Sequence, residues 1–293
     1  MEILKCSNLN KSFGRKKILN NVSLSLDEGD VLGFIGSNGA GKTTTIKLIL
    51  GLQSIDSGTV TICGYDIKKE FTKAIKNVGG IIESPDMYMY LSGYDNLKLI
   101  ANLYGVSKEK IDEVVKLVGL EKRIYDKVSK YSLGMRQRLG IAASLLNDPK
   151  LLILDEPTNG LDPEGNKQIR NLILKLSKKG IAILVSSHAL SELESIVNKV
   201  VIIQKGSIVE TSTLEEVKKS KNSYYIFEVD KIKDIENIEK ISENSFKVNI
   251  NREEIPEFIN KLIDKKIKIY SIYEDELSLE DAFLKRTGGN QID

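Results

Sequence analysis

The stretch from Leu32 to Thr43 reads LGFIGSNGAGKT, an apolar run followed by a glycine-rich loop and a lysine. Its last eight residues match the pattern GxxxxGK[ST], directly after a predicted strand and at the start of a predicted helix. Glycines let the backbone N–H groups of such a loop point inward, and the helix N-terminus adds positive potential. The pattern predicts a cradle for nucleotide phosphates, in which Lys42 reaches the β- and γ-phosphates and Thr43 binds Mg²⁺. The alternative is a glycine-rich turn without a ligand.

A second signal is the run LLILDE, residues 151–156, in which four apolar residues end in two carboxylates. Because ligands bind at the carboxyl ends of parallel strands, we expect Asp155 and Glu156 to lie at the ligand-binding edge of the sheet. Asp155 then fits the Mg²⁺ shell, and Glu156 can orient and deprotonate an attacking water. Taken alone, an acidic strand end also fits a helix N-cap.

The single histidine, His188, follows another apolar run, residues 181–185, through two serines. This order places its imidazole at the end of a neighbouring predicted strand. There it can hydrogen-bond a γ-phosphate and sense whether that phosphate is present. A lone histidine without such context is more often a structural or surface residue.

Short β-branched runs alternate with helical patterns over the first 210 residues, which is typical of a parallel α/β sheet. Helical periodicity in residues 94–104 and 108–118 predicts a helical subdomain, at about 86–148, inserted into this core. After about residue 214, a polar stretch precedes predicted strands at 224–229, 246–250 and 267–273 and predicted helices at 253–265 and 278–286, which indicate a small α+β domain. We therefore expect an α/β core over residues 1–213 and an accessory domain over 214–293.

Composition excludes several classes of protein and site. The 293 residues include 43 Lys+Arg against 41 Asp+Glu, so no basic field predicts a nucleic-acid partner. Two cysteines and one histidine are too few for a disulfide framework or a zinc site of the usual kind, so a bound metal should have oxygen ligands. No secretory signal is visible, and no apolar run approaches the ~20 residues that span a bilayer. If the protein works at a membrane, we expect another chain to supply the span.

The segment YSLGMRQR, residues 131–138, lies just before the acidic strand and completes a set of spaced motifs. Together they resemble those of the ATP-binding-cassette (ABC) ATPases over at least residues 2–213. The resemblance equates residues 36–44 with the Walker A loop, 153–156 with the Walker B strand and 159–162 with the D-loop. It implies an α/β fold of the P-loop NTPase type, an ABC cassette with a helical subdomain, and the cofactors ATP and Mg²⁺.

The resemblance also implies roles residue by residue. His188 is similar to the switch histidine, and Phe13 to the aromatic residue that stacks on adenine. The implied catalytic residues are Lys42, Glu156 and His188, and the implied metal ligands are Thr43, Glu83 and Asp155. The implied nucleotide-binding residues are Phe13, Gly36, Ser37, Asn38, Gly39, Ala40, Gly41, Lys42, Thr43, Thr44, Ser132, Gly134 and Asp162.

The segment at 131–138 departs from the family signature LSGGQ, because Leu133 replaces a glycine and Met135 replaces the glutamine. In the family this segment opens a helix that contacts the γ-phosphate of ATP bound to the other protomer. The groups that would make that contact, the Ser132 hydroxyl and the Gly134 N–H, are retained. The resemblance therefore implies a second copy of the chain, with two ATP molecules sandwiched between the copies. Whether Leu133 and Met135 weaken or alter the activity stays open.

A further departure is Glu83, which stands where most ABC ATPases have glutamine. A carboxylate still offers oxygen to Mg²⁺ or to the lytic water, but it adds a charge next to the phosphates. Such a glutamate is similar to the variant loop in ATPases of bacitracin and lantibiotic self-protection exporters. The alternative is an incidental substitution in a loop.

These features predict an ATP-hydrolysing subunit of an ABC exporter, with a role in resistance to antimicrobial peptides or drugs. Integral membrane permease subunits in separate chains would hold it at the cytoplasmic face of the cell membrane. The tail from residue 214 onward resembles those of drug and bacteriocin exporter ATPases, or it is only a cap that stabilises a dimer. The main alternative is a soluble ABC ATPase that remodels a ribosome or a repair complex. A kinase or GTPase is disfavoured, because no NKxD tetrapeptide is present and residues 131–138 would be unexplained.

Overall fold

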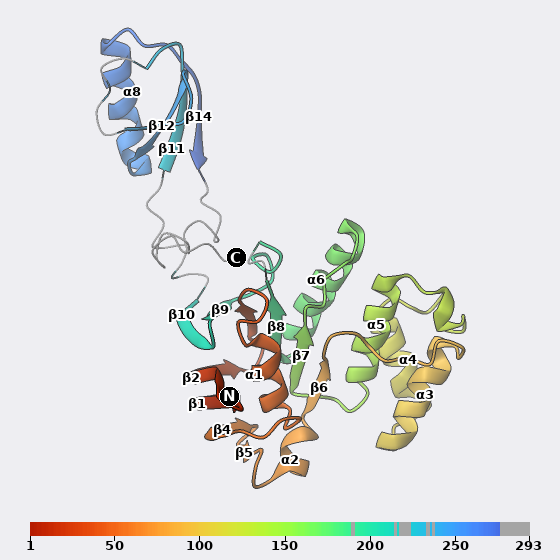
Figure 1. Cartoon of the computed structure of the whole chain (residues 1–293). Coiled ribbons are helices and arrows are strands. Elements are labelled where there is room, and N and C mark those ends of the chain that lie inside the picture. Colours follow the sequence, from red (N-terminus) through yellow and green to blue (C-terminus); the bar gives the residue numbers. More distant parts are fainter. Residues whose placement is uncertain (189–190, 214–215, 217–223, 233–234, 236–237, 276–293) are drawn as a thin grey trace. The chain divides into compact units, whose positions relative to one another are not determined.

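The computed structural model describes residues 1–188, 191–213, 216, 224–232, 235 and 238–275 (Figure 1). These fall in two compact units, one within residues 1–214 and the other within 215–291. Within the described residues, no helix combines the length and the apolar character that crossing a bilayer requires.

The core of the first unit is a six-stranded sheet in the order β10-β9-β3-β8-β7-β6. All neighbouring pairs run parallel except β10 and β9. Every residue of β3, β7 and β8 is buried, as expected of parallel strands covered on both faces. The strands are β3 (Val31–Ile35), β6 (Val78–Ile81), β7 (Leu151–Asp155), β8 (Ala182–Ser187), β9 (Lys199–Gln204) and β10 (Ser207–Thr213).

A separate antiparallel sheet, in the order β2-β1-β4-β5, adds to the parallel α/β sheet that was expected over the first 210 residues. Its strands are β1 (Glu2–Phe13), β2 (Lys16–Asp27), β4 (Ser57–Ile62) and β5 (Tyr65–Asp66), and α2 (Phe71–Ile75) follows them. Burial alternates along the end of β2, where Val22, Leu24 and Leu26 are buried. Helix α1 (Lys42–Ile49) joins the two sheets through one cluster that includes Leu4, Phe34 and Ile46.

Three helices lie between β6 and β7 in the chain and pack against one another beside the sheet (Figure 1). They are α3 (Gly93–Tyr104), α4 (Lys108–Leu117) and α5 (Leu133–Ser144), with the short η1 (Val128–Lys130) between α4 and α5. The Ser92 hydroxyl accepts a hydrogen bond from the Asp95 N–H at 3.0 Å and caps α3, which ends at Gly105 with a left-handed backbone. Helix α5 also packs against β6, and α6 (Pro163–Ser177) against β8.

The second unit is a small antiparallel sheet in the order β12-β13-β11-β14, with α8 (Ile255–Asp264) packed on one face. Its strands are β11 (Tyr224–Val229), β12 (Ile238–Lys240), β13 (Ser245–Asn249) and β14 (Ile269–Asp275), and η2 (Arg252–Glu254) leads into α8. The rings of Phe227, Phe246 and Phe258 contact one another in its core. The three longer strands and α8 agree with the sequence prediction, whereas the predicted final helix at 278–286 lies outside the described residues.

Candidate active site

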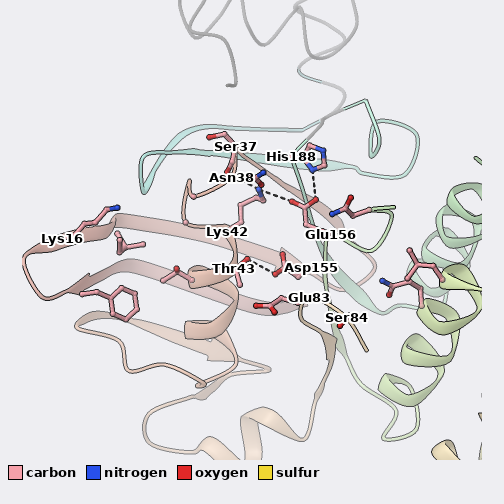
Figure 2. A pocket seen from close by; sticks show the side chains of 18 residues that line it. Lys16, Ser37, Asn38, Lys42, Thr43, Glu83, Ser84, Asp155, Glu156 and His188 are labelled. Atoms are coloured by element: carbon pink, nitrogen blue, oxygen red, sulfur yellow. Dashed lines mark hydrogen bonds and ion pairs between the residues drawn. The ribbon is translucent and has the colours of Figure 1, made fainter. Parts of the chain in front are cut away.

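A pocket of about 900 Å³ lies at the carboxyl ends of the central strands (Figure 2). The parallel register explains its position, because Ile81 pairs with Leu154, Asp155 with Ser186, and Ile35 with Ser187. The residues that follow these strands therefore meet at one edge. Among the predicted site residues, those that line the pocket are Phe13, Ser37, Asn38, Gly39, Gly41, Lys42, Thr43, Thr44, Glu83, Asp155, Glu156 and His188.

The glycine-rich loop after β3 wraps closely around the Lys42 side chain. The ammonium Nζ donates hydrogen bonds to the carbonyl oxygens of Gly36, at 2.6 Å, and Ser37, at 3.3 Å, and Lys42 is only 6% exposed. A Cβ on Gly36 would lie 2.5 Å from the Ile203 carbonyl oxygen, and Gly41 has a φ of 114°. The loop thus needs glycine at both positions.

Thr43 and Asp155 place two oxygen donors together. The Thr43 hydroxyl donates a hydrogen bond to Asp155 Oδ2 at 3.0 Å, and Asp155 is 3% exposed. Hydroxyl and carboxylate oxygens suit Mg²⁺, which keeps phosphate and water oxygens as further ligands. No cluster of three or more His, Cys, Asp or Glu that fits a metal occurs in the described ranges.

Ser186 holds the acidic strand end in place, although sequence reasoning treated it only as a link to His188. This residue is fully buried, and its hydroxyl donates to Asp155 Oδ1 and accepts a hydrogen bond from the Glu156 N–H at 2.9 Å. The sequence signal for Ser186 is a polar residue at the end of an otherwise apolar strand. Its partner depends on the register between β7 and β8.

Glu156 connects the lysine of the glycine-rich loop to the histidine (Figure 2). Its Oε1 lies 3.3 Å from Lys42 Nζ, and its Oε2 lies 2.8 Å from His188 Nδ1. The backbone at Glu156 is left-handed, with a φ of 50°, which turns the chain sharply at the end of β7. Such a conformation costs energy for a non-glycine residue and is frequent at functional sites.

Glu83 also lies in the pocket, but it makes no hydrogen bond with Thr43 or Asp155. It follows β6 with a left-handed backbone, with a φ of 64°, and its carboxylate lies 3.5 Å from Lys47 Nζ. Its side chain is 73% exposed, so the ion pair with Lys47 holds it only weakly.

Five predicted residues do not line this pocket: Gly36, Ala40, Ser132, Gly134 and Asp162. Gly36 and Ala40 are buried parts of the glycine-rich loop itself. Ser132 caps α5 by accepting from the Met135 N–H at 3.3 Å, and Asp162 caps α6 by accepting from the Gly165 N–H at 2.8 Å. The structure therefore does not bring Ser132, Gly134 or Asp162 to the pocket of the same chain.

Several lining residues were not predicted as part of the nucleotide site: Lys16, Ile18, Ser84, Leu133, Gln137 and Asn159. Lys16 and Ile18 come from the start of β2, Ser84 follows β6, and Leu133 and Gln137 lie on α5. Leu133, Gln137 and Asn159 lie within motifs found in the sequence, at 131–138 and 159–162, but a place in the nucleotide pocket of their own chain was not predicted for them. Lys16, Ile18 and Ser84 come from segments that reach the pocket only in the folded chain.

Comparison with known proteins identifies the family. A family model described as "ABC transporter" matches residues 19–159. The chain is 46% identical to the uncharacterized ABC transporter ATP-binding protein YhcH of Bacillus subtilis (strain 168), covering 98% of this chain and 96% of the relative. It is 39% identical to the bacitracin transport ATP-binding protein BcrA of Bacillus licheniformis, covering 99% of each chain. It is 42% identical to the lantibiotic transport ATP-binding protein SrtF of Streptococcus pyogenes, covering 77% of this chain and 99% of the relative.

Solved structures agree with these relatives. The ADP conformation of MJ1267, an ATP-binding cassette of an ABC transporter, has a TM-score of 0.68 and 28% identity, and the match covers 75% of this chain and 96% of that one. Relatives named as transporter proteins favour the transporter interpretation over a soluble ATPase that remodels a ribosome or a repair complex. The chain therefore belongs to the ABC transporter family, as one of its ATP-binding and ATP-hydrolysing subunits.

Proposed function

We propose that this protein powers the export of a peptide antibiotic or a related drug through membrane subunits in separate chains. The observation that carries the enzymatic part is the chain of contacts Lys42–Glu156–His188 beside the Thr43–Asp155 pair. The substrate class is supported by similarity to proteins named for bacitracin transport, lantibiotic transport and linearmycin resistance.

In this proposal the glycine-rich loop and Lys42 bind the phosphates of ATP, and Phe13, which is 49% exposed, stacks on the adenine. Thr43 and Asp155 hold Mg²⁺, and Glu83 supplies a further oxygen. A cation held there would offset the charge of the phosphates. Glu156 orients the attacking water and accepts its proton, while His188 holds the Glu156 carboxylate through Nδ1. Because Lys42 is paired with Glu156, an entering triphosphate competes with that carboxylate for the lysine.

A second copy of the chain would complete each site. The Ser132 side chain is exposed at the start of α5, outside the pocket of its own chain. The helix N-terminus there favours an anion. We therefore assign Ser132 and Gly134 to the γ-phosphate of ATP bound by the second copy, with Asp162 next to them in the dimer interface.

The membrane partner, in this proposal, docks beside the helices of the first unit. A groove of about 390 Å³ is lined by the segment from β6 to Met87, by α3 and by α5. Tyr104 lines the groove and is exposed, and exposed large side chains follow its lining segments in the chain at Tyr88 and Tyr90, just after Met87. Apolar surface of this kind marks protein interaction sites. A permease segment bound here would hold the ATPase at the cytoplasmic face of the membrane.

The proposed domain limits are 1–213 for the ATPase domain, with its helical subdomain at about 86–148, and 214–293 for the accessory domain. The three helices at 93–104, 108–117 and 133–144 support the limits of the subdomain. The change of unit near residue 214 supports the other limit.

The substitution Glu156→Gln tests the enzymatic part. It keeps the shape of the side chain but removes the base, so we expect hydrolysis to fall by roughly 10²–10⁴-fold while ATP binding persists. Size-exclusion chromatography with light scattering should then detect a dimer that depends on ATP. The matched control is Glu164→Gln on α6, where the side chain accepts a hydrogen bond from Gln168 outside the pocket. Hydrolysis by E156Q at the rate of E164Q would show that Glu156 is not the base.

The substrate class needs a separate experiment in cells. Expression together with the membrane subunits encoded beside it should raise the minimum inhibitory concentration of bacitracin or of a lantibiotic in a sensitive host. The same membrane subunits with E156Q should give no protection. Equal protection by both variants would contradict export driven by this ATPase.

A further inference from the structure

One face of α5 contacts β6 and the loop that carries Glu83. A Cβ on Gly140 would lie 2.7 Å from Pro85 Cβ and 2.9 Å from Ile81 Cδ1, and the Ser144 hydroxyl donates to the Gly80 carbonyl at 3.2 Å. Residues three and four apart share one face of a helix. Gln137, three residues before Gly140, therefore continues this contact face toward the start of α5.

Gln137 is a buried polar residue on this face. It is 4% exposed, and its Oε1 is inaccessible to solvent. Within the part of the chain that the structure describes, this oxygen accepts no hydrogen bond. Buried polar groups are nearly always hydrogen-bonded, so an unpaired side-chain oxygen at a pocket wall indicates a partner that it meets in another state.

The loop after β6 presents groups that match this carboxamide. Glu83 and Ser84 line the same pocket as Gln137. A carboxamide donates through nitrogen and accepts through oxygen, whereas a carboxylate accepts and a hydroxyl donates. The exposed ion pair of Glu83 with Lys47 at 3.5 Å is a weak competitor for the carboxylate.

We propose that Gln137 is a positioning residue for ATP hydrolysis: once nucleotide fills the pocket, its carboxamide hydrogen-bonds Glu83 and Ser84 and ties their loop to α5. This inference rests on the proposed function, because it takes the pocket as the nucleotide site. Since α5 begins next to Ser132, the tie links the nucleotide in a chain's own pocket to the segment offered to the second copy. Both sites of the dimer would then respond to either nucleotide.

The experiment compares Gln137→Leu with Gln53→Leu. Gln53 is a matched control, because its Oε1 is also buried without a partner but lies outside the pocket. We expect Q137L to lower kcat by about tenfold or more, because it removes both hydrogen bonds and one alone accounts for up to about tenfold, with KM for ATP within about twofold of the parent. In the E156Q background, hydrogen exchange should show ATP-dependent protection of residues 82–86. Q137L should abolish that protection and leave residues 36–44 protected.

A double variant tests whether Gln137 positions the loop at Glu83 or only stabilises the fold. If Gln137 acts through Glu83, the double variant E83Q/Q137L should lower kcat no more than the worse of the two single variants does. The inference is overturned if Q137L matches Q53L in kcat and in the protection of residues 82–86. It is also overturned if the fold-losses in kcat of E83Q and Q137L multiply in the double variant. Gln137→Met serves in the same assays should Q137L fail to fold. A parent protein that binds no ATP in this pocket would instead overturn the proposed function.

Discussion

Replacing Ser186 with alanine tests whether the strand register holds the acidic end of β7. The Ser186 hydroxyl bridges the Asp155 carboxylate and the Glu156 N–H, at the point where β7 pairs with β8. Alanine leaves Asp155 with the Thr43 hydroxyl at 3.0 Å as its remaining hydrogen-bond donor among the described residues. It also leaves the Glu156 N–H without a partner there.

The magnitude follows from the two lost contacts. A hydrogen bond to a charged group contributes about 1.5–3 kcal/mol, and one between neutral groups contributes about 1 kcal/mol. We therefore expect S186A to lower the free energy of unfolding by about 2.5–4 kcal/mol. For a unit of this size each kcal/mol shifts Tm by roughly 2–4 °C, so Tm should fall by about 5–16 °C.

Thermal unfolding followed by far-UV circular dichroism measures this effect, since the chain contains no tryptophan. Ser177→Ala is the control, because that hydroxyl donates only to the Leu174 carbonyl, at 3.1 Å. S177A should change the free energy of unfolding by no more than about 1 kcal/mol. An S186A protein that unfolds within 1 °C of S177A would refute the reasoning, since the bridge would then contribute nothing to stability.

Two further predictions concern the sheet and its acid stability. Burial raises the pKa of Asp30, but hydrogen bonds from Lys199, the Asp27 backbone and Asn198 outweigh it and hold that pKa below its usual 3.8. The contribution of the Asp30 carboxylate to the free energy of unfolding is therefore complete above the unfolded-state pKa and is lost as pH falls through the folded-state pKa. In urea titrations the deficit of Asp30→Asn relative to the parent should be large at pH 7 and shrink toward pH 3, and a constant deficit would contradict this. Gly79→Ala would place a Cβ against the Ser144 carbonyl, so it should lower the free energy of unfolding by about 1–3 kcal/mol or more. In the control Gly80→Ala the new Cβ lies 3.2 Å from the Ile153 carbonyl oxygen, so the loss should be smaller. Equal Tm values for these two variants would show that α5 can move away from β6.

The strands that carry the site could be predicted, because fully buried parallel strands read as short apolar runs. LGFI and LLILD fall within β3 and β7, and α1 begins at Lys42 as predicted. The antiparallel sheet was missed, although its signal is present as the alternation from Val22 to Asp27. Strand β12 carried almost no signal, since Ile238 is the one apolar residue among its three.

Local pattern also predicted which residues line the pocket after each strand, including Lys42, Asp155 and His188. It did not predict what these residues contact. The bridge through Ser186 depends on strand register, and the position of Gln137 depends on how α5 packs on β6. Both follow from tertiary packing between segments far apart in the chain, which no window of sequence contains.

The left-handed backbone at Glu83 and Glu156 has a consequence for how these positions can change. Glycine adopts this conformation without strain, whereas a β-branched residue there is a genuine outlier. The fold alone would thus be better served by glycine at both strand ends. If the two carboxylates have the roles proposed above, keeping them trades stability for chemistry, and selection of random variants for heat resistance alone should replace these two residues at the expense of activity.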